Sequence, residues 1–359
     1  MNSLQLLPIL PQSYHSSNPI RLWLDDSFYR SQIPVMTLFD SSDLCVTIFL
    51  VLPYEMTMLR LFTLIHSLVP AGLIAPPQVY DVTKELIYYP VTGKCPLREG
   101  RFERIRLGLD FVWHGCYPEW RYIEQDALIE KLMTAKTYNR EGIEPLLNGQ
   151  WVVFTAGAMG AGKGYVMKYL WDKNLIPLDS FVVVDPDWIR MELPEWPYLV
   201  KMNPKLAGSV LQKESGYLAE IAREALILAK QNVLVDGSLR DTEWALKDIQ
   251  KLKDRGLKIG VIHVTGNRET FKTQAEVRGH ATNRYVDAKL VLSSFRGSRK
   301  TFKLLSRIPL LLDFAVQIYN SGDQADPLLT VFRIHGRDQK LNIEAIKEAM
   351  LSLFPSMPS

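Results

Sequence analysis

A glycine-rich segment after residue 150 carries the strongest chemical signal in the chain. It ends in a lysine with the spacing G-x-x-x-x-G-K, after an apolar run and before an amphipathic stretch. Glycines let the backbone curl so that its N–H groups surround a phosphate, and the lysine adds an ammonium for the outer phosphate oxygens. We therefore expect this segment to bind ATP through Gly157, Gly160, Ala161, Gly162, Lys163 and Gly164.

One position departs from the usual form of this loop. The residue after the lysine is normally Ser or Thr, whose hydroxyl binds Mg²⁺, and here it is Gly164. ATP binding does not depend on that hydroxyl. We expect Mg²⁺ to be held through water and through carboxylates elsewhere in the site.

Aspartates follow two further apolar runs. Asp185 and Asp187 come after Phe181–Val184, and Asp236 comes after Asn232–Val235. Phosphoryl transfer to a hydroxyl needs a base near the nucleophile and oxygen ligands for Mg²⁺. Asp185 ends its strand, which predicts a magnesium ligand, and Asp187 lies further out, which predicts the base. The alternative is that either aspartate only caps the following turn.

The elements that must position these residues alternate along the chain after Pro145. The apolar runs predict strands at 151–155, 181–184, 232–235, 258–265, 314–319 and 328–334. Helical periodicity predicts helices from the lysine to 172, at 206–230 and 285–306, and others after the N-caps Asp241, Asn267 and Asn342. This order is typical of an α/β, P-loop NTPase-type fold with a mostly parallel sheet flanked by helices. Ligands of such sheets bind at the carboxyl ends of the strands.

Four blocks of residues, in order, resemble the zeta toxin family of phosphate-loop kinases over roughly residues 145–335. The blocks are Gly157–Lys163, Asp185–Arg190, Asp236–Arg240 and Arg278–Tyr285. Members of that family transfer a phosphoryl group from ATP to a sugar hydroxyl of UDP-N-acetylglucosamine or a related nucleotide sugar.

The resemblance implies roles for individual residues. Lys163 matches the loop lysine, and Asp187 matches the aspartate that acts as base. Arg278 and Arg284 match the arginines that hold the transferring phosphate. The segment that contacts the substrate is matched by Asp236, Ser238 and Arg240.

Two positions in the substrate segment differ from the family pattern. Asp236 is one methylene shorter than the family's glutamate, so it reaches less far. Leu239 replaces a glycine, which would narrow a substrate channel.

The sequence thus predicts a kinase domain at 145–359 that requires ATP and Mg²⁺, after a mixed N-terminal extension at 1–144 of unknown role and unknown protein partner. The acceptor would be a hydroxyl of a small molecule or nucleotide sugar, such as a UDP-N-acetyl amino sugar. Two alternatives remain open: a nucleoside, nucleotide or polynucleotide kinase, and a nucleotide-binding module with reduced catalysis.

Composition limits the kinds of partner and the cellular compartment that we expect for this protein. The chain has 359 residues with a net charge of +3 and is 47% hydrophobic, which excludes a wholly disordered protein. Its three cysteines form no disulfide or metal pattern, which favours a reducing, cytoplasmic location. The apolar stretch 44–75 is interrupted by charges and prolines, so it predicts a strand and a helix (56–68) and no membrane span. A basic stripe is more typical of a solvated helix face than of nucleic-acid binding; it comprises Arg296, Arg299, Lys300, Lys303 and Arg307.

Overall fold

The chain divides into two compact units, Met1–Asp81 and Val82–Ser359. The computed structural model describes residues 100–135, 137–138, 150–323 and 325–354, and the backbone of three strands in the first unit. Those strands form an antiparallel sheet of β1 (Arg21–Leu24), β2 (Val35–Phe39) and β3 (Cys45–Phe49). The helix expected at 56–68 and the boundary proposed at 144/145 lie outside the described residues.

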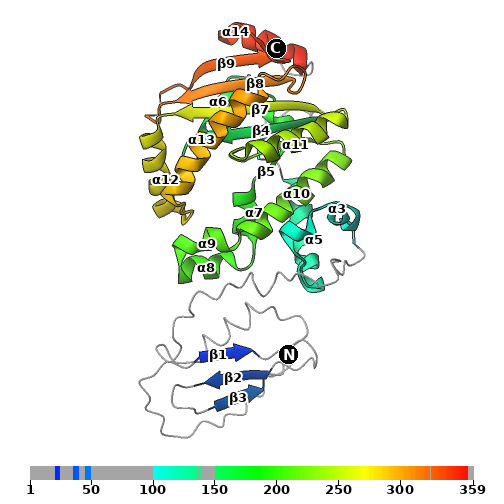
Figure 1. Ribbon diagram of the computed structural model, residues 1–359, viewed down its shortest axis with the longest axis vertical. Coiled ribbons are helices and arrows are strands. Elements are labelled where there is room, and N and C mark those ends of the chain that lie inside the picture. The colour runs from blue at the N-terminus through cyan, green and yellow to red at the C-terminus, as the bar shows by residue number, and fades with distance from the viewer. Residues whose placement is uncertain are drawn as a thin grey trace. The chain divides into compact units, whose positions relative to one another are not determined.

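A seven-stranded sheet with the order β10-β9-β8-β7-β4-β6-β5 forms the centre of the second unit (Figure 1). The parallel strands are β5 (Phe181–Val184), β6 (Asn232–Val235), β4 (Trp151–Gly157), β7 (Lys258–Gly266) and β8 (Phe314–Asn320). Two antiparallel strands, β9 (Leu328–Ile334) and β10 (Arg337–Asp338), extend the sheet beyond β8. The predicted mostly parallel sheet is confirmed, and each of the six strands predicted after Pro145 is present to within two residues.

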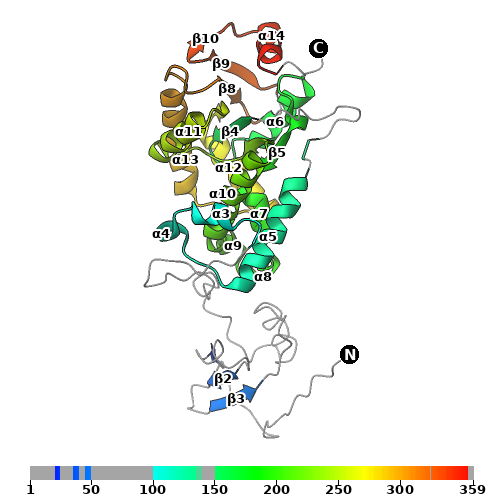
Figure 2. The ribbon, with the colours of Figure 1, turned by 90° about the vertical axis from the view of Figure 1, so that its right-hand side faces the viewer.

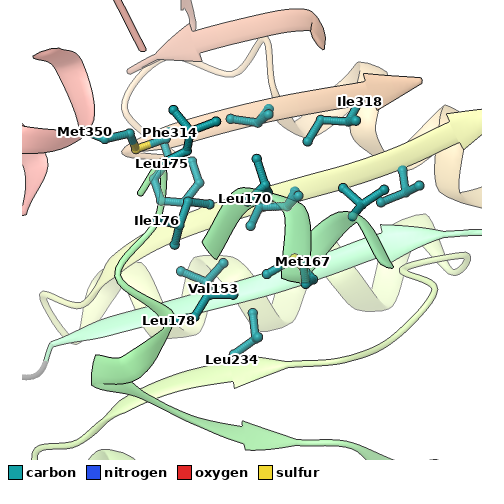
Figure 3. Close-up of a cluster of buried hydrophobic side chains, with 14 of the residues drawn as sticks. Val153, Met167, Leu170, Leu175, Ile176, Leu178, Leu234, Phe314, Ile318 and Met350 are labelled. Carbon is teal, nitrogen blue, oxygen red and sulfur yellow. The ribbon is translucent and has the colours of Figure 1, made fainter. Parts of the chain in front are cut away.

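Helices cover both faces of this sheet, because its central strands are apolar on both sides. Every residue of β4 is buried. On one face lie α6 (Lys163–Asp172) and α14 (Ile343–Leu353), where Met167 and Leu170 pack beside Val153 and Phe314 (Figure 3). On the other face lie α10 (Gln212–Leu228), α11 (Thr242–Asp254) and α13 (Ala288–Leu305). The result is the three-layer arrangement that places ligands at the strand ends.

Capping side chains begin several of these helices where the sequence predicts them. Asp241 accepts hydrogen bonds from the backbone N–H groups of α11, and Asn267 and Asn342 do the same for α12 (Arg268–Thr282) and α14. The helix predicted at 206–230 is instead two helices, α9 (Pro204–Val210) and α10, which meet at Leu211. Leu211 is fully buried, so the apolar pattern continues across the break and hides it from periodicity.

Three helices before the sheet belong to the same compact unit. They are α3 (Glu103–Leu107), α4 (Phe111–His114) and α5 (Glu119–Thr134), and α5 matches the helical pattern of its sequence. Ile129 and Leu132 of α5 are buried in one cluster with Tyr217 and Leu218 of α10. This part of the proposed N-terminal extension therefore shares a hydrophobic core with the sheet.

The prediction about the cysteines is wrong at one position. Cys116 is fully buried and disulfide-bonded, and sequence spacing did not reveal it because such pairing depends on proximity in space. Among the described residues, no helix is long and apolar enough to span a membrane.

Candidate active site

The loop between β4 and α6 adopts the conformation that its glycines predict. Gly160 and Gly162 have φ angles of 82° and 74°, in the left-handed region that disfavours other residues. A Cβ at Gly160 would lie 2.2 Å from the carbonyl oxygen of Phe271, and one at Gly162 would lie 2.4 Å from Nδ2 of Asn320. Helix α6 begins at Lys163, so the backbone N–H groups of its first turn, which have no partner within the helix, lie at the loop. Both features fit the phosphates of ATP.

Residues at the carboxyl ends of β8 and β6 hold this loop in place. The Nδ2 group of Asn320, at the end of β8, donates a hydrogen bond of 2.9 Å to the carbonyl of Ala161. The backbone N–H of Gly157 donates to the carbonyl of Ser238, at 3.1 Å. Motif spacing does not assign this role to Asn320, because only the order of strands in the sheet brings its side chain to the loop.

The predicted aspartates meet at the same edge, where parallel β5 and β6 end side by side. The backbone N–H of Asp236 donates to the carbonyl of Val184, at 2.9 Å, and its carboxylate accepts from the hydroxyl of Thr155. Oδ1 of Asp185 accepts from the N–H of Asp187 at 2.8 Å, so Asp185 also caps α7 (Pro186–Glu192). Burial, followed by the negative charges of Asp236 and Asp187, raises the pKa of Asp185 to about 6.

These carboxylates are the oxygen donors that Mg²⁺ prefers. Within the described part of the chain, no group of three or more His, Cys, Asp and Glu side chains is arranged to hold a metal. Mg²⁺ in phosphoryl-transfer sites commonly takes one or two carboxylates and completes its coordination with phosphate and water, and the carboxylates at this edge fit that pattern. Asp185 remains the predicted protein ligand.

Arginines surround Asp187. Its Oδ2 accepts a hydrogen bond from Nη2 of Arg284, which follows α12. Its Oδ1 lies 3.3 Å from Nη1 of Arg190, one helical turn further along α7. Burial alone would raise the pKa of Asp187, but Arg284 and Arg190 hold it below its usual value. Asp187 is thus an ionised carboxylate with both oxygens occupied by guanidinium groups.

Arg278 lies close enough to these groups to feel their charge. Burial, and then the positive charge of Arg284, lowers the pKa of Arg278, whereas Asp187 and Asp185 oppose that shift. Its Nε is buried without a hydrogen-bond partner among the described residues. The structure therefore brings the charges of Arg278, Arg284 and Asp187 into one site, as the sequence predicts, and adds Arg190, to which motif spacing assigns no role.

The predicted substrate segment follows β6. Ser238 is half-buried, whereas Arg240 is exposed and its backbone packs against Gly297 of α13. Leu239 has a φ of 47°, a conformation that glycine adopts more easily, and its side chain is buried in the core beside Phe154. The expectation that Leu239 narrows a substrate channel is wrong, because its side chain lies in the core.

The profile described as Zeta toxin matches residues 132–326, more than half of the chain. The chain belongs to the zeta toxin family. The match contains the phosphate loop, the aspartates and the arginines described above. It also places the chain among phosphate-loop kinases, as the sequence resemblance implied.

Several solved structures are similar to this zeta toxin family member. The PezAT chromosomal toxin–antitoxin system of Streptococcus pneumoniae aligns with 15% identity and a TM-score of 0.47, covering 66% of this chain and 89% of that one. The AvrRxo1-ORF1:-ORF2 complex aligns with 15% identity and a TM-score of 0.47, covering 75% and 81%. The Pnkp1/Rnl/Hen1 RNA repair complex aligns with 15% identity and a TM-score of 0.33, covering 46% and 49%. No curated protein sequence matches the chain.

Proposed function

We propose that this protein transfers the γ-phosphoryl group of ATP to a hydroxyl of a small-molecule acceptor, with Asp187 as the general base. The observation that carries the proposal is the placement of an ionised carboxylate and two basic side chains at the strand edge that carries the phosphate loop. Charge spreads over the γ-phosphoryl group during transfer, so cations are needed there as well as a base.

Each residue has a defined part in this proposal. The loop and Lys163 bind the phosphates of ATP, and Asp185 would hold a Mg²⁺ ion, which would supply positive charge to neutralise the phosphates. Asp187 accepts the proton of the acceptor hydroxyl, whose oxygen then attacks the γ-phosphorus as the bond to ADP breaks. Arg278 and Arg284 stabilise the transferring group.

For the acceptor we propose a nucleotide sugar, in particular a UDP-N-acetyl amino sugar. Membership of the zeta toxin family supports this class. In this proposal Asp236, Ser238 and Arg240, which follow β6, bind the sugar hydroxyls, with Asp236 oriented by the hydroxyl of Thr155. The shorter Asp236 favours an acceptor that approaches the end of β6 closely.

A substrate panel tests this function. Purified protein is incubated with Mg²⁺, labelled ATP and nucleotide sugars, nucleosides, nucleotides or a 5′-hydroxyl oligonucleotide, and each product is identified by mass. Asp187→Asn keeps the size of the side chain and removes the proton acceptor, so turnover should fall on the order of 10²-fold with ATP affinity nearly unchanged. Asp185→Asn should instead change the magnesium requirement. Full activity in both variants would contradict the kinase mechanism.

A further inference from the structure

Different arginines occupy the two oxygens of Asp187. Arg190 of α7 lies 3.3 Å from Oδ1, and Arg284 donates to Oδ2. Each oxygen keeps a second lone pair that can face the acceptor hydroxyl, but a guanidinium on the same oxygen makes it a weaker proton acceptor. The oxygen whose arginine is exchanged more easily is therefore the better base.

The two arginines are held very differently. The side chain of Arg190 is 10% exposed, and its Nη2 donates a 2.5 Å hydrogen bond to Oε1 of Gln212, the first residue of α10. Helix α9 also packs closely against the guanidinium of Arg190, since a Cβ at Gly208 would lie 3.3 Å from its Nη1. The side chain of Arg284 is 22% exposed and, among the described residues, hydrogen-bonds to Asp187 alone.

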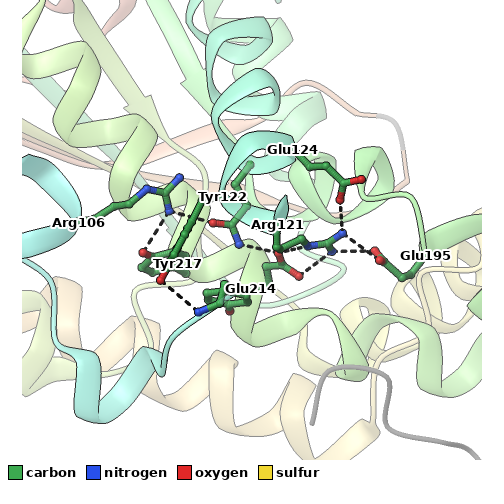
Figure 4. Close-up of polar contacts among 9 residues, drawn as sticks. Arg106, Arg121, Tyr122, Glu124, Glu195, Glu214 and Tyr217 are labelled. Carbon is green, nitrogen blue, oxygen red and sulfur yellow. Dashed lines mark hydrogen bonds and ion pairs between the residues drawn. The ribbon is translucent and has the colours of Figure 1, made fainter. Parts of the chain in front are cut away.

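The partner of Arg190 is itself fixed by a buried network. Glu214, two residues after Gln212, receives hydrogen bonds from Nε and Nη2 of Arg121, at 2.6 and 2.8 Å (Figure 4). Arg121 also binds both oxygens of Glu195, just before α8 (Trp196–Met202). The first turn of α10 therefore has little freedom to move, and neither has Gln212.

From this asymmetry we propose that Arg190 is a positioning residue, which keeps its contact with Oδ1 of Asp187 throughout the reaction while Arg284 leaves Oδ2 for a phosphate. The proposal rests on the proposed role of Asp187 as base. A phosphate group carries more negative charge than a carboxylate and competes well for an arginine that is partly exposed. Arg190 is enclosed by α9 and α10, so it continues to orient the carboxylate after Arg284 has moved.

The test is a double-mutant cycle on kcat, KM and ATP affinity. Arg190→Gln should lower kcat on the order of 10²-fold, the effect of a misaligned reacting group, with ATP affinity within about twofold of wild type. In an Asp187→Asn background the same change should have almost no further effect, because Arg190 acts through that carboxylate. Arg190→Lys should restore activity only in part, since an ammonium lacks the two-sided geometry that contacts Asp187 and Gln212 together.

Arg223→Gln is the matched control. Arg223 of α10 pairs with Asp248 of α11, and the two side chains are 12% and 14% exposed. This variant removes a comparably buried arginine–aspartate pair away from the site, so it reports loss of stability without loss of positioning, and its kcat should stay near wild type.

The outcomes distinguish failure of the positioning role of Arg190 from failure of the kinase mechanism. If Asp187→Asn abolishes turnover but Arg190→Gln leaves kcat intact, the positioning role is overturned and the kinase mechanism stands. If Arg190→Gln lowers kcat by the same factor in both backgrounds, the residue acts structurally and the proposal is again overturned. If Asp187→Asn is fully active, the mechanism itself fails.

Discussion

At the scale of single residues, Lys163 is the best-defined test of nucleotide binding. It is the first residue of α6 and follows a glycine in the left-handed conformation. Lys163→Ala removes a charge-assisted contact with phosphate, which is worth about 1.5–3 kcal/mol. We expect ATP affinity to fall roughly tenfold or more in a nucleotide titration. Lys168→Ala is the control, because Lys168 lies on the same helix and its side chain is 63% exposed; equal affinities for all three proteins would contradict the loop assignment.

Arg278 and Arg284 should act on turnover more than on ATP affinity. Arg284 hydrogen-bonds to Asp187, and the positive charge of Arg278 lowers the pKa of the same carboxyl. Replacement of either by Ala should lower kcat on the order of 10²-fold or more, because charge on the γ-phosphoryl group increases towards the transition state. Arg296→Ala provides the control, since Arg296 is exposed on the basic face of α13. Two alanine variants with wild-type kcat would remove these arginines from the mechanism.

His263 of β7 gives a prediction about pH and stability. It is buried, stacks on Phe302, and is hydrogen-bonded to Gln317 at 3.2 Å. Burial lowers its pKa from 6.5 to about 4; the hydrogen bond with Gln317 opposes that shift, and the positive charge of Arg299 adds to it. As the pH decreases, His263 is therefore protonated near pH 6.5 in the unfolded chain but only near pH 4 in the folded chain. The free energy of unfolding falls as the pH decreases through this window.

His263→Gln should flatten that dependence. Between pH 7 and 4.5 the variant should lose less stability than wild type, by roughly 2 kcal/mol, because one titrating group has been removed. Urea unfolding at several pH values measures the difference. Parallel curves for the two proteins would show that His263 does not titrate in this way.

Residues in local motifs could be found from sequence, and residues defined by distant partners could not. Lys163 and Asp187 are recognisable because the loop and the strand-end aspartates have fixed spacing. Arg190 lies only three residues after Asp187, but its significance depends on Gln212, which is far away in sequence. Asn320 likewise gains its role from the order of the strands.

At the scale of elements, burial on both faces made the strands predictable. Phe181–Val184 and Asn232–Val235 have the predicted bounds because a doubly covered strand is a continuous apolar run. Helix α7 was missed although Asp185 at its N-cap and Pro186 at its first position are a recognised start signal. Helix α8 gives a weaker signal, because Pro197 lies in its first turn but its N-cap residue makes no side-chain capping hydrogen bond. It follows Glu195, which is anchored by Arg121 from 74 residues earlier.

Replacing Arg121 tests how much its ion pairs stabilise the packing of α5 against α8 and α10. Its guanidinium binds Glu195 and Glu214, and all three side chains are buried. Arg121→Ala leaves two buried carboxylates without their cation, so stability should fall by about 3–5 kcal/mol in urea unfolding. Arg101→Ala breaks an exposed pair with Glu130 and should cost about 0–1 kcal/mol. Similar losses in both variants would argue against a structural role for the buried network.

At the scale of the whole molecule, the compact unit that contains the seven-stranded sheet begins before the region that the family profile matches. The matched region starts at residue 132, within α5, whereas the compact unit starts at Val82. The buried cluster on α10 includes residues from α3 and α5, such as Ile105 and Ile129. A kinase domain that started at 145 would lack these side chains, together with Arg121.

Two truncations of the chain test this directly. A fragment of residues 82–359 keeps α3, α5 and the Arg121 network, so it should unfold cooperatively and bind ATP. A fragment of residues 145–359 exposes the apolar surface of α10 and leaves Glu195 and Glu214 buried beside no cation, so it should be far less stable. Thermal unfolding, with and without ATP, measures both fragments. If the shorter fragment is as stable as the longer one and binds ATP equally well, α3–α5 are dispensable and the kinase domain does begin near residue 145.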